Sequence, residues 1–401
     1  MFKKILSAFL ALAIGCTTPG LERGYTREVR LRPPDLDHPV DVNTDYALAL
    51  SEGISYLGEK TGKHADKYML TRAGQAVATL WLDGAVSYWS HEMGHAYNVP
   101  LDRDRGWDFE GGTNNAGLPK VDFKGGTTTL DNDLASVVGG LNQSESNARK
   151  LWERTDTITL DRATAFLAFK LDDSTYNIRA AYDEDDDFFR IRFFNRLPGK
   201  NEYLYAPTIP REATANDLNK TGVIFEYLGL PLGHGEKEIE RRAVVADLLT
   251  VRNYESMWAI WKYVVTGQKT STPLDFDVAG HKVVPPIVGT YLTKRGVFCN
   301  ADFSVDGNKF SVGRNTDFPD WRVGVGLGER QVGCFSLSPF GAFNRIGGED
   351  GFTLGTDIGF ELGKNASLVF NLQKSEDDVI ENGVKRVRDG TDVQAGWRVK
   401  W

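Results

Sequence analysis

Two hydrophobic periodicities divide the chain. Between about residues 41 and 280, apolar positions recur every three or four residues, which is the spacing of amphipathic helices. From about residue 283 onward, apolar positions alternate with polar and glycine positions in short runs, which is the spacing of strands. The pattern predicts an α+β protein with a helical domain at 41–280 and an antiparallel β domain at 281–401.

The alternation in the β domain has two interpretations. In Phe352–Leu362, the Phe, Leu and Ile positions fall on one face and Gly, Asp and Glu on the other. The first interpretation is an antiparallel sheet whose apolar face packs on the helical domain. The second is a small β-barrel whose apolar face meets lipid and whose interior is polar and rich in glycine. Its last strand, with Trp401, then resembles the terminal strand of bacterial outer-membrane β-barrels.

The N-terminus has the pattern of an export signal. Lys3-Lys4 precedes an apolar run, Ile5 to Ile14, that is too short to span a bilayer. This predicts a signal peptide at 1–15, followed by a polar tether at 16–40. The segment ending in Gly15-Cys16 resembles the lipobox of bacterial lipoproteins, which implies lipid on the Cys16 thiol. We therefore expect an exported protein of the bacterial cell envelope, in the outer membrane or periplasm, attached to the membrane through Cys16 or the β domain.

The cysteine count bears on disulfide bonding, and the net charge bears on nucleic-acid binding. Apart from Cys16, the chain contains only Cys299 and Cys334, and an even pair in an exported protein predicts a disulfide. Two buried free thiols fit the same spacing. The formal net charge is -8 and the basic residues form no stripe, so nucleic acid is not an expected partner.

The candidate chemistry lies in His91-Glu92-Met93-Gly94-His95, near the end of a helix predicted at 70–98. A spacing of four residues places both imidazoles on one helix face, where their nitrogens can bind one Zn²⁺ at about 2 Å. Glu92 lies beside them and suits the role of base for a metal-bound water. Two structural histidines on a helix face are the alternative.

The next predicted helix supplies a candidate third ligand. Glu145 falls within an apolar stripe of Leu, Val, Ala and Trp. A carboxylate at such a position is costly unless it is paired or bound to metal. A salt bridge to Arg149 or to another arginine is the alternative explanation. His234 and His281 are weaker ligand candidates because no partner accompanies either of them.

These segments resemble a known enzyme family. The run from His91 through His95 to Ala96 resembles the HExGHA helix of gluzincin metallopeptidases, most closely the membrane-associated CAAX-protease type. Glu145-Ser146-Asn147-Ala148 resembles their downstream ExxA segment, although Arg149 stands where the family has Asp. The resemblance implies a zincin-like helical domain that binds Zn²⁺ through His91, His95 and Glu145, with Glu92 as general base and acid.

The function that this resemblance implies is a zinc endopeptidase of the cell envelope, which would cleave a protein or peptide substrate with a zinc-activated water. A zinc amidase or deacylase acting on cell-wall or lipid substrates would use the same chemistry. The non-enzymatic alternative is an outer-membrane protein or lipoprotein with a structural metal or none.

Overall fold

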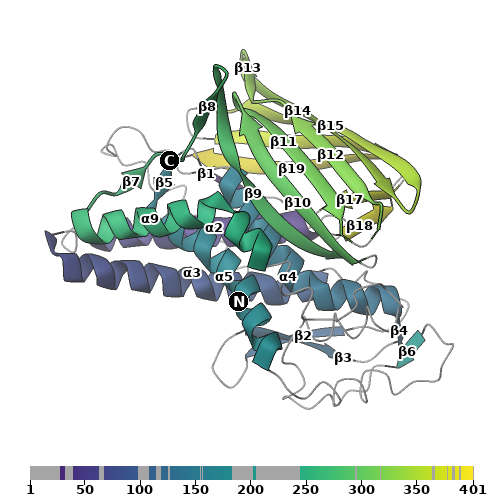
Figure 1. The fold of residues 1–401 in the computed structure, drawn as a ribbon, viewed down its shortest axis with the longest axis horizontal. Coiled ribbons are helices and arrows are strands. Elements are labelled where there is room, and N and C mark those ends of the chain that lie inside the picture. Colours follow the sequence, from purple (N-terminus) through teal and green to yellow (C-terminus); the bar gives the residue numbers. More distant parts are fainter. Residues whose placement is uncertain are drawn as a thin grey trace.

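The protein has two layers, a set of packed helices and a large curved antiparallel sheet above them (Figure 1). Within the sequence, the helices precede nearly all strands of the sheet. The computed structural model describes residues 28–31, 39–62, 67–97, 108–113, 119–124, 127–153, 155, 157–182, 202–204, 244–293, 296–316, 318–363, 366–376, 378–381, 384–387 and 390–400. The predicted signal peptide, Cys16 and His234 lie outside these residues.

The helical layer is organised around α4. Its long helices are α2 (Pro39–Gly62), α3 (Met69–Tyr97), α4 (Leu130–Glu153), α5 (Leu160–Tyr182) and α9 (Val251–Thr266). Three short strand pairs accompany them: β2 (Asp108–Thr113) with β3 (Pro119–Lys124), β4 (Thr127–Thr129) with β6 (Glu202–Leu204), and β5 (Ile158–Thr159) with β7 (Thr270–Ser271). Helix α4 packs against α2, α3 and α5, and against strand β9 of the large sheet. The helix predicted at 70–98 is confirmed by α3.

An apolar cluster joins the helices to the sheet. Its buried members are Ala47, Leu48, Val86, Ala148, Leu151, Trp152, Ala165, Phe166, Phe169 and Ile287. They come from α2, α3, α4, α5 and β9, so one core spans both layers. Full burial of each large side chain contributes about 1.5–3 kcal/mol before entropy is counted, and Ile287 attaches β9 to this core.

The large sheet is antiparallel throughout and is not closed. Its order is β1-β19-β16-β15-β14-β12-β11-β10-β9-β8, with β13 paired to β14 at one side. The bounds are β1 (Glu28–Leu31), β8 (Phe276–Val278), β9 (His281–Thr293), β10 (Gly296–Val305), β11 (Asn308–Asn315), β12 (Trp321–Gly326), β13 (Arg330–Val332), β14 (Phe335–Ile346), β15 (Glu349–Glu361), β16 (Ala366–Glu376) and β19 (Gly390–Lys400). A separate pair, β17 (Asp378–Glu381) with β18 (Val384–Val387), extends the β16–β19 connection.

Tight turns explain the regular neighbour pairing. Asp306 and Gly307 connect β10 to β11 and have φ values of 50° and 79°. A two-residue hairpin with both central residues at positive φ is the turn that matches strand twist, and Asp-Gly is a favoured sequence for it. Because such turns join adjacent strands, β9 to β12 and β14 to β16 follow sequence order across the sheet.

The two faces of the sheet are unlike. The inner face, towards the helices, buries Asn300, Asp302, Ser311, Asn315, Ser336, Asn344, Thr353, Ser367, Ser375, Gln394 and Arg398. The outer face exposes Val312, Val323, Val325, Phe335, Phe343, Leu354, Phe370, Leu372, Val393 and Trp397. The inner face also buries Ile287, Tyr291, Phe298, Ala342 and Ile346, so it is mainly polar with an apolar part. The expectation that the apolar face of the sheet packs on the helical domain is therefore wrong, because the more apolar face is the exposed outer one.

Three other expectations can be compared with the fold. The α+β class with a C-terminal antiparallel sheet is confirmed, and the sheet is open rather than a closed barrel. Residues 28–31, expected within the tether, form β1 and pair with β19. Within the described ranges, no helix is both long enough and apolar enough to cross a membrane.

The possible Cys299–Cys334 disulfide is not formed, since both residues are free cysteines. Cys299 lies on β10 and Cys334 in the turn between β13 and β14, with β11 and β12 between these strands. Three strand spacings are about 14 Å, whereas a disulfide needs α-carbons within about 7 Å. Sequence spacing carried no information on that separation.

Candidate metal centre

The two motif histidines converge in the interior of the helical layer. His91 and His95 lie one turn apart near the C-terminal end of α3, and their exposed fractions are 0% and 9%. Their Nε2 atoms are 3.1 Å apart and the rings meet edge to face, with centroids 4.8 Å apart. The four-residue spacing therefore produces the convergence that the sequence predicted.

Glycines on the facing helix make room for this pair. A Cβ at Gly140 of α4 would clash with the Nε2 atoms of both histidines. On α3 itself, Gly94 lies between the two histidines in sequence, and a Cβ there would lie 2.5 Å from the carbonyl oxygen of Gly139. The two helices thus cross at backbone distance, and the imidazoles face bare backbone at Gly140.

Glu92 lies next to the pair in sequence and is half-buried. It therefore retains access that His91 lacks. A general base must reach the water that it deprotonates, so partial exposure beside the convergent imidazoles suits that role.

The predicted third ligand points elsewhere. Glu145 is buried, and its Oε1 forms an ion pair with Nζ of Lys170 on α5. Its other oxygen, Oε2, would lie 2.6 Å from a Cβ at Gly289 of β9. Lys170 also contacts Asp247, at 2.9 Å. The salt-bridge explanation for the buried carboxylate therefore describes this structure, with a lysine in place of the arginine that we considered.

Helix geometry explains why Glu145 does not join the histidines here. It follows Gly140 by five residues, which rotates its side chain about 140° around α4. Gly140 faces α3, so Glu145 faces α5 and β9. In the part of the chain that the structure describes, no group of three or more His, Cys, Asp or Glu side chains is arranged to hold a metal ion.

Arg149, the departure from the family pattern, attaches α4 to the sheet. Its Nε lies 3.1 Å from Asp302 on β10 and 3.2 Å from Glu153. Burial disfavours its charge, but the two carboxylates raise the pKa of the guanidinium overall. Burial also raises the pKa of Asp302, and Arg149 opposes that increase. An aspartate at position 149 would remove this link.

The sequence reasoning missed a polar network around the histidines. All six residues of Asn142–Asn147 on α4 are buried. The Asn147 amide donates to Ser90 Oγ at 2.8 Å, and the Gln143 amide donates to Thr44 Oγ1 at 2.8 Å and to Asn147 Oδ1 at 2.9 Å. A helix that is polar on all sides and still buried requires such partners. The available signal was the unbroken polar run inside an otherwise amphipathic helix.

A second buried polar group lies further back on α3. Asp83 accepts hydrogen bonds from Ser51 at 2.6 Å and from Thr164 at 2.7 Å. Burial raises the pKa of the Asp83 carboxyl to about 7, despite these hydrogen bonds, which lower it. Negative charge on Asp161 and Glu52 adds smaller increases.

The other histidine candidate among the described residues lies far from α3 in the fold. His281 is exposed at the start of β9, and its Nδ1 lies 2.7 Å from Asp306 Oδ2 in the next hairpin. That pairing explains His281 without a metal.

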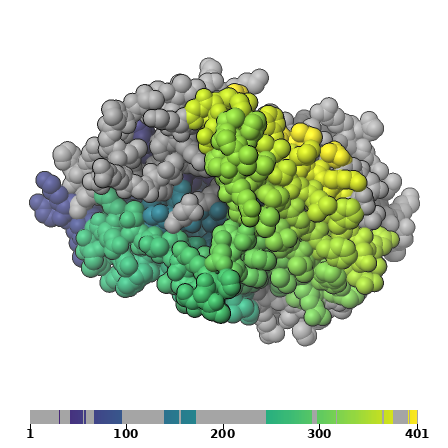
Figure 2. Space-filling view, turned by 90° about the horizontal axis from the view of Figure 1, so that it is seen from above, coloured from purple at the N-terminus to yellow at the C-terminus, as the bar shows by residue number. Residues whose placement is uncertain are grey.

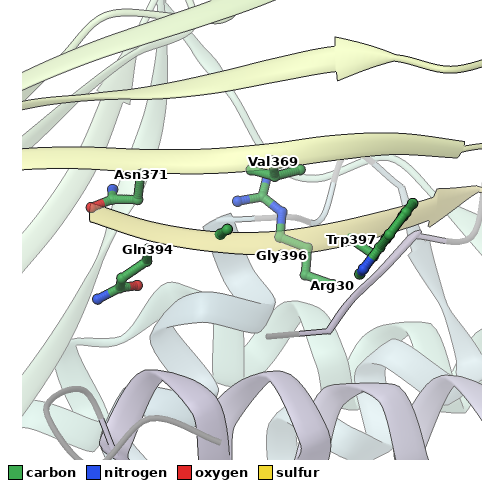
Figure 3. Close-up of a pocket in the computed structure, with 7 residues that line it drawn as sticks. Arg30, Val369, Asn371, Gln394, Gly396 and Trp397 are labelled. Atoms are coloured by element: carbon green, nitrogen blue, oxygen red, sulfur yellow. The ribbon is translucent and has the colours of Figure 1, made fainter. Parts of the chain in front are cut away.

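The inner face of the sheet encloses a polar cavity of about 510 Å³ with the C-terminal part of α4. Its charged lining includes Arg149, Asp302 and Arg322. A smaller recess lies where Arg30 of β1 crosses β19 at Gly396 and extends towards β16 (Figure 3).

Comparison of the chain with models of protein families, with curated proteins and with solved structures gives no match.

Proposed function

We propose that His91 and His95 bind a zinc ion and that the protein is a zinc-dependent hydrolase in which Glu92 is the general base. The observation that carries this proposal is the separation of 3.1 Å between two buried Nε2 atoms. Two nitrogens bound to one tetrahedral zinc at about 2.0–2.1 Å are roughly 3.3 Å apart. The pair is therefore close to ligand geometry without rearrangement of the helix.

The remaining roles follow from the chain's own groups. Zinc, when bound, would polarise a carbonyl and make its water more acidic. The imidazoles provide two neutral nitrogen ligands, and the Glu92 carboxylate accepts the water proton and returns it to the leaving nitrogen. Peptide-bond cleavage in the cell envelope stays a prediction from the family resemblance, as does Glu145 as third ligand. In this structure Glu145 fits its ion pair with Lys170 and not the histidine site.

A structural histidine pair is the second candidate, and the same distance favours it. An Nε2 to Nε2 separation of 3.1 Å also fits a hydrogen bond between one protonated and one unprotonated nitrogen. The neighbouring amide and hydroxyl network would then be a polar core without a metal. Metal content separates the two candidates.

The test measures zinc and activity on the same purified full-length variants. We expect one zinc per chain in the unmodified protein and in Glu92→Gln, and a loss of at least tenfold in zinc affinity in His95→Ala. His281→Ala is the matched control, because it removes an exposed histidine outside the site. Cleavage of an unfolded protein substrate should disappear in Glu92→Gln while zinc remains.

Two results would contradict the proposal. Equal zinc content in the unmodified protein and His95→Ala would remove the histidine pair as a metal site. Full cleavage by Glu92→Gln would remove Glu92 from its role and leave the metal assignment standing.

A further inference from the structure

The outer face of the sheet is apolar over most of its width. Outward side chains of β11, β12, β14, β15, β16 and β19 include ten Val, Leu, Phe and Trp residues with exposed fractions from 36% at Phe370 to 63% at Val393. In Figure 2 these strands, green to yellow, occupy one side of the molecule, and α9 lies on the other. An isolated exposed apolar residue is ordinary, whereas a continuous apolar face indicates a binding surface.

The strand registers show that the face is continuous. One row across the sheet runs through Val312, Val323 and Phe343. A second row joins Phe335 to Phe360, and continues through Leu368 to Trp397. Neighbouring strands therefore present apolar side chains side by side.

The inner face of the sheet has the opposite character, because its polar side chains form hydrogen bonds with one another. Asn300 donates to Asp302 at 2.6 Å, and Ser311 donates to Asn300 at 3.1 Å. Arg398 donates to Ser367 at 3.1 Å and to Ser336 at 3.2 Å. These side chains have hydrogen-bond partners inside the fold, so the covered face of the sheet is mainly polar and the open face is apolar. A sheet that faces water alternates in the reverse sense.

We propose that this outer face contacts the hydrocarbon chains of a lipid bilayer. The polar-in, apolar-out alternation is that of strands surrounded by lipid. The surface also spans six neighbouring strands of a sheet that curves around the inner cavity. A protein partner of standard size covers one patch of about 800 Å². Lipid covers a surface that curves across several strands from every direction, which suits this face.

The dimensions and borders of the face fit a bilayer. On β14, outward positions from Phe335 to Phe343 extend for roughly 20 Å along the membrane normal at a strand tilt near 40°, against an apolar band of about 25 Å in membrane sheets. Aromatic rings lie at both ends of this band. The ring centroids of Trp321 and Phe343 are 5.5 Å apart at one end, and those of Phe335 and Phe360 are 5.2 Å apart at the other. Aromatic side chains are enriched where a bilayer meets water.

On β12, β14 and β15, charges begin beyond one aromatic end of the face, and on β16 they begin at Lys374, which pairs with Leu354. Arg345 pairs across the sheet with Trp321 on β12 and with Asp350 on β15. Arg345 and Asp350 are both about half exposed, and their atoms lie 3.7 Å apart. The apolar band therefore gives way to a polar border, as a bilayer boundary requires.

The edges of the open sheet lie beside protein. Strand β1, at one edge, contacts α2. At the other edge, the short strand β8 pairs only with the first three residues of β9, and the longer β9 contacts both α4 and α9. Unpaired backbone groups of an edge cannot face hydrocarbon without a large cost. Strands β1 and β9 are thus next to the helices, and the lipid-facing arc is the paired part of the sheet, from β11 to β19.

The experiment is flotation of the full chain with vesicles of phosphatidylethanolamine and phosphatidylglycerol, in a Cys16→Ser background that removes the predicted acylation site. Leu354→Arg and Val393→Arg place a charge in the apolar band, and Asp350→Arg places it at the exposed polar border next to Arg345. We expect the background protein and Asp350→Arg to float, and the two band variants to show at least tenfold less vesicle binding.

Equal flotation of all four proteins would overturn the proposal, because binding would then reside outside the sheet. Absence of flotation in the background protein would overturn it too. A Leu354-dependent dimer in vesicle-free solution, without vesicle binding, would assign the face to a second copy of the chain.

A second measurement guards against misfolding of the arginine variants. A polarity-sensitive dye is attached to a cysteine placed at position 354 or 350, after the three native cysteines are changed to serine. Vesicles should shift the emission to the blue at position 354 and leave it unchanged at 350. The same emission at both positions would contradict lipid contact.

Discussion

Helix α4 and the outer face of the sheet depart from the usual distribution of residues in opposite directions. The Asn142–Asn147 run of α4 is polar and fully buried, while the outer strand faces are apolar and exposed. The polar run is stabilised within the chain, by hydrogen bonds to α2 and α3 and by the Glu145–Lys170 ion pair. The apolar face has no such cover among the described residues. The buried polar groups are therefore explained by partners within the chain, whereas the exposed apolar groups indicate a partner outside it.

The largest expected effect in the polar region comes from Lys170→Met. The change leaves Glu145 and Asp247 buried without their shared cation, which should cost about 3–5 kcal/mol of unfolding free energy. Lys282→Met is the matched control, since it breaks an exposed pair with Asp275 and should cost at most about 1 kcal/mol. Urea unfolding measures both. Equal small losses of unfolding free energy in both variants would show that Lys170 does not stabilise the buried carboxylates next to α4.

The second prediction concerns the pH dependence that Asp83 imposes. The folded pKa of about 7 exceeds the unfolded value of 3.8, so the folded state holds the proton more tightly between these pH values. Stability of the unmodified protein should therefore fall as pH rises from about 4 to 7, by an amount on the order of 3–4 kcal/mol from this group.

Asp83→Asn removes this titration, so its stability relative to the unmodified protein should increase over that range. Asp306→Asn serves as control: hydrogen bonding to His281 and Lys282 lowers the pKa of Asp306, so its ionised form favours the fold and the substitution should not stabilise the protein. Denaturant titrations at successive pH values measure the difference. A constant difference for Asp83→Asn from pH 4 to 8 would contradict the assigned shift.

The third prediction separates packed from open glycine positions in the sheet. A Cβ at Gly359, on the inner face, would clash with Ser336 and lie 2.7 Å from Arg398. Gly359→Ala should therefore cost about 1–3 kcal/mol. Gly341→Ala, on the outer face, meets the flexible end of Leu354 at 3.1 Å and the carbonyl oxygen of Thr353 at an ordinary contact distance of 3.6 Å, and should change the unfolding free energy by less. The opposite ranking would mean that the inner face is not closely packed.

The fourth prediction concerns zinc affinity at the crossing of α3 and α4. Gly140→Ala places a methyl group against both imidazoles, so zinc affinity should fall at least tenfold. Gly84→Ala is also a helical substitution, but its Cβ meets nothing within 4 Å. It should leave zinc binding unchanged and stabilise the helix by up to about 1 kcal/mol. Zinc titration followed by thermal unfolding tests both variants, and unchanged zinc affinity in Gly140→Ala would contradict the placement of the site.

Local patterns predicted local structure well. The 3.6-residue spacing located α3 to within one residue at each end, and it placed His91 and His95 on one face. Period two placed a strand at Phe352–Leu362, where the structure has β15. These features depend on neighbours in sequence, which is why one sequence was sufficient.

The missed features depend on contacts between distant segments. Glu145 was correctly expected to be buried, but α4 is enclosed on every side, so burial did not indicate which neighbour the carboxylate meets. Alternation likewise defined two faces of the sheet without indicating which one turns towards the helices. Strand β1 pairs with β19 across almost the whole chain, and no local pattern marks a partner at that distance.

X-ray absorption at the zinc edge, on the purified full-length protein, tests the metal assignment most directly. We predict a spectrum with two imidazole nitrogens at about 2.0–2.1 Å from zinc, and loss of that imidazole signature in His95→Ala but not in His281→Ala. Zinc without imidazole ligands, or an identical spectrum in all three proteins, would contradict a zinc site at His91 and His95.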